Sequence, residues 1–335
     1  MSGYMPDVPA DGGLWRLDSQ LVWEGAVGWT SECLPFTDGV LDRYRGAGFG
    51  MLGLTVAAEW NTPDQALRHI GRVRRSLLDR PDVAIVQTAA DIEAARRASR
   101  LAVGFTFQGG GPYGQDLGLV EVFKALGVGL AILSYNGRTA LGDGCQEAGN
   151  AGLSAIGRRF VTEMNRVGVI IDLSHVGERT ALDTIQHSND PVVFSHSNPR
   201  RMHAHVRNIR RKLIKACAGS GGVIGLNSLS FMLSDTGRST VEDYVAHIQA
   251  VADIVGAEHV ALGMDWNFYD PFMQRMFAEN PALAALGYPP PPWDSLAPET
   301  LPQIVGALHA RGWSNADVTA ILGGNMMRIA RRVWR

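Results

Sequence analysis

The stretch that decides the fold is VIIDLSHVGERTALDTIQHSNDPVVFSHSNPR, residues 169–200. It contains two short apolar runs that each end on a histidine, VIIDLSH at His175 and PVVFSH at His196. The run ERTALDTIQH lies between them and has the length and periodicity of a helix. Two strand-like runs joined by a helix predict a βαβ unit with parallel strands. Because parallel strands end at one edge of their sheet, both histidines are expected at that edge.

The same pattern extends along most of the chain. Eight near-continuous apolar runs of strand length alternate with helical patterns, as expected for strands that are buried on both faces. The runs are residues 21–27, 50–57, 101–107, 128–134, 168–174, 191–195, 222–228 and 259–264. Eight such repeats predict a (β/α)8 barrel of the TIM type. A further short run, residues 83–87, is interpreted as an accessory strand.

The last seventy residues are organised differently. Residues 268–300 are Pro-rich and irregular, which predicts a long loop over one mouth of the barrel. Helical patterns then follow over residues 301–313 and 314–333, and Ser314 is the expected N-cap of the second helix. We therefore expect residues 1–335 to form a single barrel domain with a Pro-rich loop near residues 270–300.

Composition excludes several classes of protein. A chain of 335 residues with 46% hydrophobic and 19% charged residues has the composition of a soluble globular protein. The net charge of −2 gives no support for binding nucleic acid or an anionic membrane. Three widely spaced cysteines without a CxxC pair, and an N-terminus without a basic or apolar leader pattern, predict a reducing, cytoplasmic location. The basic cluster of Arg207, Arg210, Arg211 and Lys212 has helical spacing and is interpreted as a solvated face.

Polar residues gather at the carboxyl ends of the predicted strands, where the active sites of such barrels lie. They are Gln108, Tyr135, Asn136, His175, His196, Asn227 and Asp265. So many polar groups at these positions favour a site over packing. His175 and His196 could share one metal ion, or each could be a hydrogen-bonded residue of the barrel mouth without metal. The glycines at 109–111 could hold an anion through their N–H groups or form an ordinary loop.

Several motifs resemble the membrane (renal) dipeptidase family, peptidase M19. They are DLSHV (172–176), FSHSNPR (194–200), RNI (207–209), the block LSYNGRTALGDGCQEAGNAGLSAIGRRFVTEMNRVG (133–168), LGMDW (262–266) and ARGWSNADVTAILGGNMMRIARRV (310–333). The similarity covers residues 101–335 well and the first hundred residues poorly. The resemblance implies a (β/α)8 barrel of the metallo-dependent hydrolase type, in agreement with the strand pattern.

The resemblance also implies a chemistry. Members of the family hydrolyse dipeptides with a hydroxide that bridges two zinc ions. The family's two metal-binding histidines correspond to His175 and His196. An arginine that holds the substrate carboxylate corresponds to Arg207, and an aspartate near the substrate amine corresponds to Asp265. Tyr135 occupies the position that polarises the scissile carbonyl, and a phenol can donate a hydrogen bond in that role.

Three of the five family metal ligands are changed. In WEGAVGW, Ala26 and Gly28 occupy the positions of an HxD pair, and Gln108 replaces the bridging glutamate. We therefore expect at most one zinc or other divalent ion per chain, and no two-zinc centre. His175 and His196 with one carboxylate would make a smaller site. That carboxylate could be Asp265.

The sequence is also compatible with other roles for these carboxylates and for Arg207. Glu24 and Glu59 are alternative metal-binding carboxylates, or surface and salt-bridge residues. Asp265 could instead be a structural carboxylate or helix cap, and Arg207 a helix-surface charge.

The sequence is compatible with two functions. The first is an M19-like metallodipeptidase that acts on a dipeptide or a small amino-acid-derived amide with a free carboxylate. Tyr135 and Asp265 would be its catalytic residues, and Arg207, Tyr135, Asp265 and Gln108 would bind the substrate. The second is a non-hydrolytic relative that binds, or transforms without a metal pair, a small zwitterionic amino-acid derivative. The sequence leaves open whether the protein is a homodimer.

Overall fold

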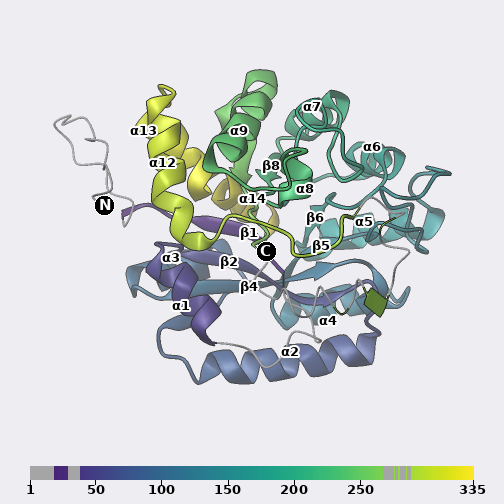
Figure 1. Cartoon of the computed structure of the whole chain (residues 1–335). Coiled ribbons are helices and arrows are strands. Elements are labelled where there is room, and N and C mark those ends of the chain that lie inside the picture. Colours follow the sequence, from purple (N-terminus) through teal and green to yellow (C-terminus); the bar gives the residue numbers. More distant parts are fainter. Residues whose placement is uncertain (1–18, 29–37, 267–274, 276–277, 280–283, 285–287) are drawn as a thin grey trace.

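Eight parallel strands form the centre of the protein in a computed structural model, which describes residues 19–28, 38–266, 275, 278–279, 284 and 288–335 (Figure 1). The strands follow one another in the order β1 (Trp23–Val27), β2 (Met51–Ala58), β4 (Leu101–Gln108), β5 (Val128–Ile132), β6 (Ile170–Asp172), β7 (Val193–Phe194), β8 (Val223–Leu226) and β9 (Val260–Leu262). Every pair of neighbours in this order is parallel. The predicted (β/α)8 TIM-type barrel is confirmed. The accessory strand is confirmed as well, because β3 (Val83–Ile85) pairs with β4 outside this order.

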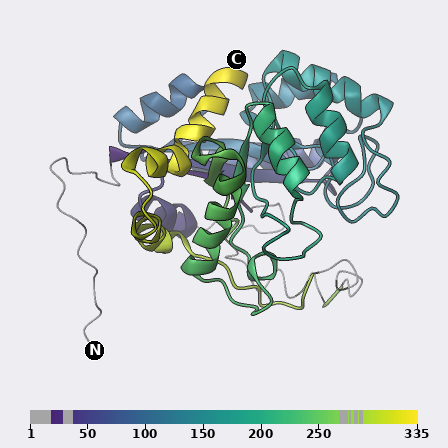
Figure 2. The same ribbon diagram turned by 90° about the horizontal axis from the view of Figure 1, so that it is seen from above.

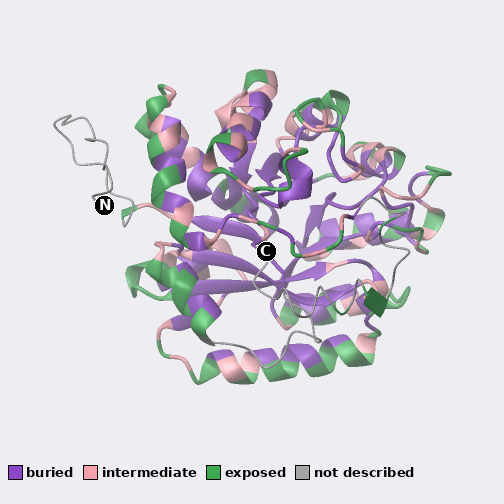
Figure 3. Ribbon diagram, in the orientation of Figure 1, coloured by how far each residue is buried: buried purple, intermediate pink, exposed green. Residues whose placement is uncertain are grey.

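The helices surround the strands (Figures 1 and 2). They are α1 (Asp38–Gly46), α2 (Pro63–Leu78), α3 (Ala89–Arg97), α4 (Gly118–Ala125), α5 (Ala155–Val167), α6 (Glu178–His187), α7 (Arg211–Gly219), α8 (Ser230–Leu233), α9 (Val241–Val255), α12 (Leu301–Ala310), α13 (Asn315–Thr319) and α14 (Asn325–Val333). The strands are buried, whereas the helices alternate between buried and exposed positions (Figure 3). This division follows from the sequence, whose strand runs are apolar throughout and whose helices are apolar on one face.

The strands in the second half of the barrel are shorter than their apolar runs. The run over residues 168–174 yields only three strand residues, Ile170–Asp172. The cause is the Asp172 side chain, whose Oδ1 accepts hydrogen bonds from the backbone N–H groups of Ser174 and Ser195, both at 2.9 Å. A side-chain oxygen therefore replaces the backbone acceptor, and the hydrogen-bond ladder between β6 and β7 ends there.

Local sequence signals explain where the helices begin and end. Ser314 accepts a hydrogen bond from the N–H of Asp317, which confirms it as the N-cap of α13. The predicted helix over residues 314–333 is not continuous, because a π-helical segment, η6 (Ala320–Gly324), separates α13 from α14. At Gly323 a Cβ atom would lie 2.3 Å from the carbonyl oxygen of Leu21. The chain here therefore passes so close to the residues before β1 that only glycine fits.

The amino-terminal end of the barrel is closed by the C-terminal residues. The indole of Trp334 lies 5.7 Å from that of Trp23, and its Nε1 donates to the carbonyl oxygen of Gly129 at 2.8 Å. A Cβ atom at Gly129 would lie 2.7 Å from the Trp334 ring. Glycine in β5 thus makes the room that this aromatic plug requires.

One buried carboxyl group joins the two ends of the strand order. Glu24 is fully buried, and its Oε1 accepts from the N–H of Ala26 at 3.0 Å and faces the N–H of Asp265 at 3.5 Å. Burial raises the pKa of Glu24 to about 8. Neither a surface role nor a salt bridge describes Glu24, which instead links β1 to the residues after β9.

Part of the predicted loop near residues 270–300 lies outside the described residues. Within the described part, residues 288–297 contain no helix or strand. Tyr288 and Trp293 from this segment pack on Phe231, with ring centroids 5.5 and 5.1 Å from it. No helix in the described part of the chain has the length and apolar character needed to cross a lipid bilayer.

Candidate active site

The structure brings the predicted site residues to one mouth of the barrel. Gln108 ends β4, Tyr135 follows β5, and His175, His196 and Asp265 follow β6, β7 and β9. Because the strands are parallel, their carboxyl ends lie on the same side. His175 and Asp265 have left-handed backbone conformations, with φ of 68° and 52°. Such conformations are costly for residues other than glycine and cluster at functional sites.

His175 and His196 contact each other directly. Their Nε2 atoms are 2.9 Å apart, and both side chains are buried. Burial, followed by the charge of Arg207, lowers the pKa of each imidazole well below its ordinary value. Both rings are therefore neutral at physiological pH. A single proton between the two nitrogens then satisfies both, with one nitrogen donating and the other accepting.

A chain of buried hydrogen bonds holds this histidine pair on both sides. His175 Nδ1 lies 2.8 Å from Oδ1 of Asn136, and His196 Nδ1 lies 2.6 Å from Oγ of Ser195. Ser195 in turn contacts Oδ2 of Asp172. Oδ1 of Asn136 is an acceptor and also faces Sγ of Cys145 at 3.4 Å.

The other side of the pair is held by Ser195 and Asp172. Oγ of Ser195 donates to Oδ2 of Asp172. Burial raises the pKa of Asp172, whereas the hydrogen bonds from Ser195 and Ser174 lower it.

Tyr135 forms one wall of the site. Its ring stacks on His175 with the centroids 3.9 Å apart and packs edge-on against Trp60 at 5.6 Å. Burial raises the pKa of the Tyr135 phenol well above its ordinary value. The phenol is therefore neutral and can donate a hydrogen bond to a ligand carbonyl.

Arg207 is the buried cation of the site, with 3% of its surface exposed. It precedes α7, which begins at Arg211. The interpretation of Arg207 as part of a solvated helix face is therefore wrong, because the residue lies before the helix and inside the protein. Its single side-chain hydrogen bond within the described residues runs from Nη2 to the carbonyl oxygen of His196, at 3.4 Å. The positive charge is thus left without a matched anion in that part of the chain.

Asp265 provides the opposite charge at the mouth. It is partly exposed, and its Oδ2 accepts from Nδ2 of Asn227 at 3.1 Å. Burial raises the pKa of Asp265 to about 6, and Arg207 opposes this effect. The carboxylate is therefore mostly ionised at neutral pH and accessible to a cationic ligand group.

The side chains that the structure describes do not form a two-metal centre. Ala26 and Gly28 have no donor atoms, and Gln108 uses its amide nitrogen to donate to Oγ1 of Thr55 at 3.1 Å. Among the residues that the structure describes, no three His, Cys, Asp or Glu side chains are grouped so that they could hold a metal ion. His175, His196 and Asp265 therefore do not form the metal site suggested by the sequence. The Asp265 carboxylate instead accepts a hydrogen bond from Asn227.

Glu59 is hydrogen-bonded to the glycine loop at residues 109–111. Oε2 of Glu59 accepts from the N–H of Gly110 at 2.9 Å. The N–H group of the loop that could have held a ligand anion therefore binds a carboxylate of the chain itself. Burial raises the pKa of Glu59 to about 7. Within the described residues Glu59 forms no salt bridge, so its role is to connect the loops after β2 and β4.

Several residues of the site were not identified from the sequence. Asp172 and Ser195 had a detectable signal, since each is a polar residue within an apolar run and a few positions before a histidine. Tyr288 had none. It comes from the Pro-rich segment, and its hydroxyl accepts from Nδ2 of Asn136 at 2.7 Å.

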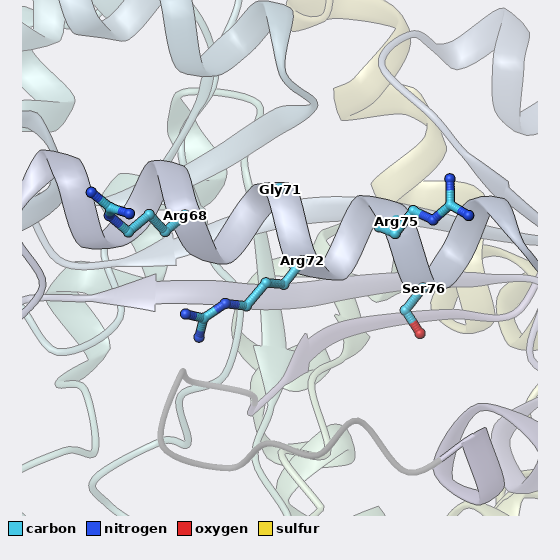
Figure 4. A pocket seen from close by; sticks show the side chains of 5 residues that line it. All are labelled: Arg68, Gly71, Arg72, Arg75 and Ser76. Atoms are coloured by element: carbon cyan, nitrogen blue, oxygen red, sulfur yellow. The ribbon is translucent and has the colours of Figure 1, made fainter.

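A surface depression is lined by residues of a single helix and by none of the candidate site residues. It lies on α2 and is lined by Arg68, Gly71, Arg72, Arg75 and Ser76 (Figure 4). Arg68 and Arg75 form ion pairs with Asp64 and Asp79, one turn away along the helix. Exposed pairs of this kind contribute little and indicate a solvated helix surface.

The amino-acid sequence is similar to a known protein family and to several of its members. Residues 41–276 match the family model described as membrane dipeptidase (peptidase family M19). The chain is 28% identical over 272 residues to "Dipeptidase tcpJ" of Claviceps purpurea, and 32% identical over 193 residues to "Uncharacterized dipeptidase C965.12" of Schizosaccharomyces pombe. These matches cover 80% and 56% of this chain, but only 59% and 46% of the relatives.

Solved structures share the fold over nearly the whole chain. An amidohydrolase from Pseudomonas aeruginosa superposes with a TM-score of 0.84 and 29% identity, covering 95% of this chain and 98% of its own. A metallo peptidase from Rhodobacter sphaeroides, liganded with a phosphinate mimic of the dipeptide L-Ala-D-Ala, gives a TM-score of 0.77 at 18% identity. That second match covers 94% of this chain and 99% of the other.

Proposed function

The chain belongs to the membrane dipeptidase family, peptidase family M19, and we propose that it acts on a dipeptide or a small amino-acid-derived amide with a free carboxylate. Family membership supports a hydrolase. The narrower proposal on the ligand rests on charges that lie at one mouth of the barrel. Arg207 and Asp265 there carry opposite charges, and Tyr135 is a neutral hydrogen-bond donor.

The observation that carries the proposal is the buried guanidinium of Arg207. A buried charge normally has a partner, because removing it from water is costly. Within the described residues the guanidinium donates only to a backbone carbonyl, at 3.4 Å. A ligand carboxylate would complete it with two parallel hydrogen bonds. Asp265 would bind the ligand amine, and Tyr135 would donate to the carbonyl between the two charged ends.

A specific observation favours a second, non-hydrolytic function. The side chains in the described part of the chain do not form a metal-pair site, and the two imidazoles are hydrogen-bonded to each other at 2.9 Å. A protein with this set could bind a zwitterionic amino-acid derivative, or transform it without two metal ions. We propose at most one zinc or other divalent ion per chain, held by the Nε2 atoms of His175 and His196. Ligand binding by Arg207, Asp265 and Tyr135 does not depend on that ion.

Direct assays separate the two functions. Purified protein is incubated with a panel of dipeptides, with and without added Zn²⁺, and release of free amino acids is followed by chromatography. Calorimetric titration of the same dipeptides measures binding. Release that is lost in Arg207→Ala supports hydrolysis, and binding without release supports the second function. If free dipeptides bind no more tightly than forms blocked at both ends, the proposed zwitterionic ligand is wrong.

A further inference from the structure

Trp60 is an exposed aromatic residue at the mouth of the barrel. It lies in the turn that follows β2, and 49% of its surface is exposed. Its indole packs edge-on against the ring of Tyr135, with the centroids 5.6 Å apart, and Tyr135 also stacks on His175. The three rings therefore form a row that runs from the buried histidine pair outward, and Trp60 is its exposed end.

The turn that carries Trp60 is fixed by hydrogen bonds before and after the indole. Asn61 donates its N–H to the carbonyl oxygen of Ala58 at 3.0 Å, and its Oδ1 accepts from the N–H of Ala58 at 2.8 Å. Glu59 donates its N–H to the carbonyl oxygen of Gln108, the last residue of β4, at 3.0 Å. An ordered turn thus presents the indole to solvent.

An indole held in this way is suited to bind an apolar group. Single exposed apolar residues are common on protein surfaces, but tryptophan is highly buried on average. A rigid aromatic side chain loses little conformational entropy when a partner covers it, and tryptophan is enriched where proteins bind their partners. A ligand group that covers Trp60 would gain an apolar contact that the charged groups of the mouth do not provide.

The strand order places Trp60 relative to the proposed ligand-binding groups. The order is β1-β2-β4-β5-β6-β7-β8-β9, and β9 packs against β1. Trp60 follows β2, which is two steps from β5, the strand before Tyr135. In the other direction, two steps lead from β2 to β9, the strand before Asp265. Arg207 contacts the residues after β7, which is four steps from β2 in either direction. Trp60 therefore lies between Tyr135 and Asp265 and opposite Arg207.

We propose that Trp60 is a specificity-determining residue, which contacts the side chain of the ligand's amino-terminal residue and favours a large apolar or aromatic side chain there. In such a residue the side chain is attached to the carbon between the amine and the carbonyl. With the amine at Asp265 and the carbonyl at Tyr135, this carbon lies in the interval that Trp60 borders. The inference rests on the proposed function, which assigns the amine and the carbonyl to these two residues. It adds the class of the amino-terminal residue, which the charges at the mouth leave undefined.

The test compares dipeptides that differ only in their first residue. Dissociation constants of phenylalanyl-glycine and alanyl-glycine are measured by calorimetry with wild-type protein, Trp60→Ala and Trp60→Phe. We expect wild-type protein to bind phenylalanyl-glycine about 3- to 10-fold more tightly, which is within the usual range for one aromatic pair. This preference should disappear in Trp60→Ala. Most of it should remain in Trp60→Phe, which keeps an aromatic ring.

Two controls separate this contact from a general effect. Glycyl-phenylalanine and glycyl-alanine carry the same difference in the second residue, and Trp60→Ala should leave the ratio of their affinities unchanged. Leu78→Ala removes another exposed apolar side chain, at the far end of α2, and should keep the wild-type preference for phenylalanyl-glycine. Both positions are exposed, so Trp60→Ala and Leu78→Ala should melt close to wild type.

The outcomes distinguish the inference from the proposed function. If free dipeptides bind and binding requires Arg207, but phenylalanyl-glycine has no advantage or Trp60→Ala keeps that advantage, the inference is wrong and the proposed function stands. If no dipeptide binds wild-type protein, or if free dipeptides bind no more tightly than forms blocked at both ends, the proposed function fails, and the inference fails with it.

Discussion

Replacing Arg207 by lysine tests how the proposed ligand is held. Arg207 has 3% of its surface exposed, and its guanidinium donates weakly to one backbone carbonyl in the described part of the chain. Two of its N–H groups can therefore bind one carboxylate side by side. Lysine keeps the positive charge but presents a single ammonium group in place of the planar fork. The change thus removes one charge-assisted hydrogen bond and leaves the attraction between opposite charges.

The expected magnitude follows from that loss. A hydrogen bond to a charged group contributes about 1.5–3 kcal/mol, and about 1.4 kcal/mol corresponds to a tenfold change in affinity. Arg207→Lys should therefore weaken the binding of a free dipeptide by roughly 10- to 150-fold. The same dipeptide with an amidated C-terminus should bind wild-type protein weakly and should lose little further affinity in the variant.

The assay is calorimetric titration of both forms of the dipeptide against both proteins. Arg201→Lys, an exposed arginine in the same loop, is the matched control and should bind like wild type. The reasoning is refuted if the amidated dipeptide binds wild-type protein as tightly as the free acid does.

Three further predictions concern other parts of the molecule. Asp265 has a pKa of about 6, so the affinity for a ligand amine should rise between pH 5 and 7 as the carboxyl ionises, and Asp265→Asn should remove that rise in calorimetric titrations. Glu24 has its pKa raised from 4.5 in the unfolded chain to about 8, so the folded form holds its proton more tightly. The resulting stability should decrease as the pH rises from 4.5 to 8, and Glu24→Gln should make urea unfolding less pH-dependent over that range. Trp334→Ala should lower the free energy of unfolding by about 3–5 kcal/mol, because the plug beside Gly129 is removed; a loss below 1 kcal/mol in urea unfolding would contradict this role.

The fold could be predicted because its signal is local and repeated. Each buried strand is an apolar run bounded by turn residues, and the runs at 101–107 and 128–134 lie within one to two residues of β4 and β5. The predicted and observed strand ends differ where a side chain replaces a backbone hydrogen-bond acceptor. Asp172 ends β6 by accepting two backbone N–H groups, and nothing in the hydrophobic pattern distinguishes it from a ladder residue.

The site could be predicted only in part. His175, His196 and Asp265 could be predicted as site residues because each follows a strand. In a parallel barrel the ends of the strands lie together, whatever the loops do. Partners from distant segments could not be found in this way. Arg207 has helical spacing to its basic neighbours, yet it is buried, and the contact of Tyr288 with Asn136 joins residues 152 positions apart. Such contacts depend on how loops fold over the barrel, which no local pattern encodes.

Metal content is the measurement that tests the central claim most directly, namely that this M19 member retains the ligand-binding charges without the family's metal pair. Untagged protein is equilibrated with excess Zn²⁺, freed of unbound metal, and analysed by plasma mass spectrometry. We expect zero or one ion per chain, because Ala26 and Gly28 have no donor atoms and Gln108 brings no charge. Replacing these three together, as Ala26→His, Gly28→Asp and Gln108→Glu, should raise the metal content. A wild-type value near two ions per chain, with dipeptide hydrolysis that follows the second ion, would contradict the claim.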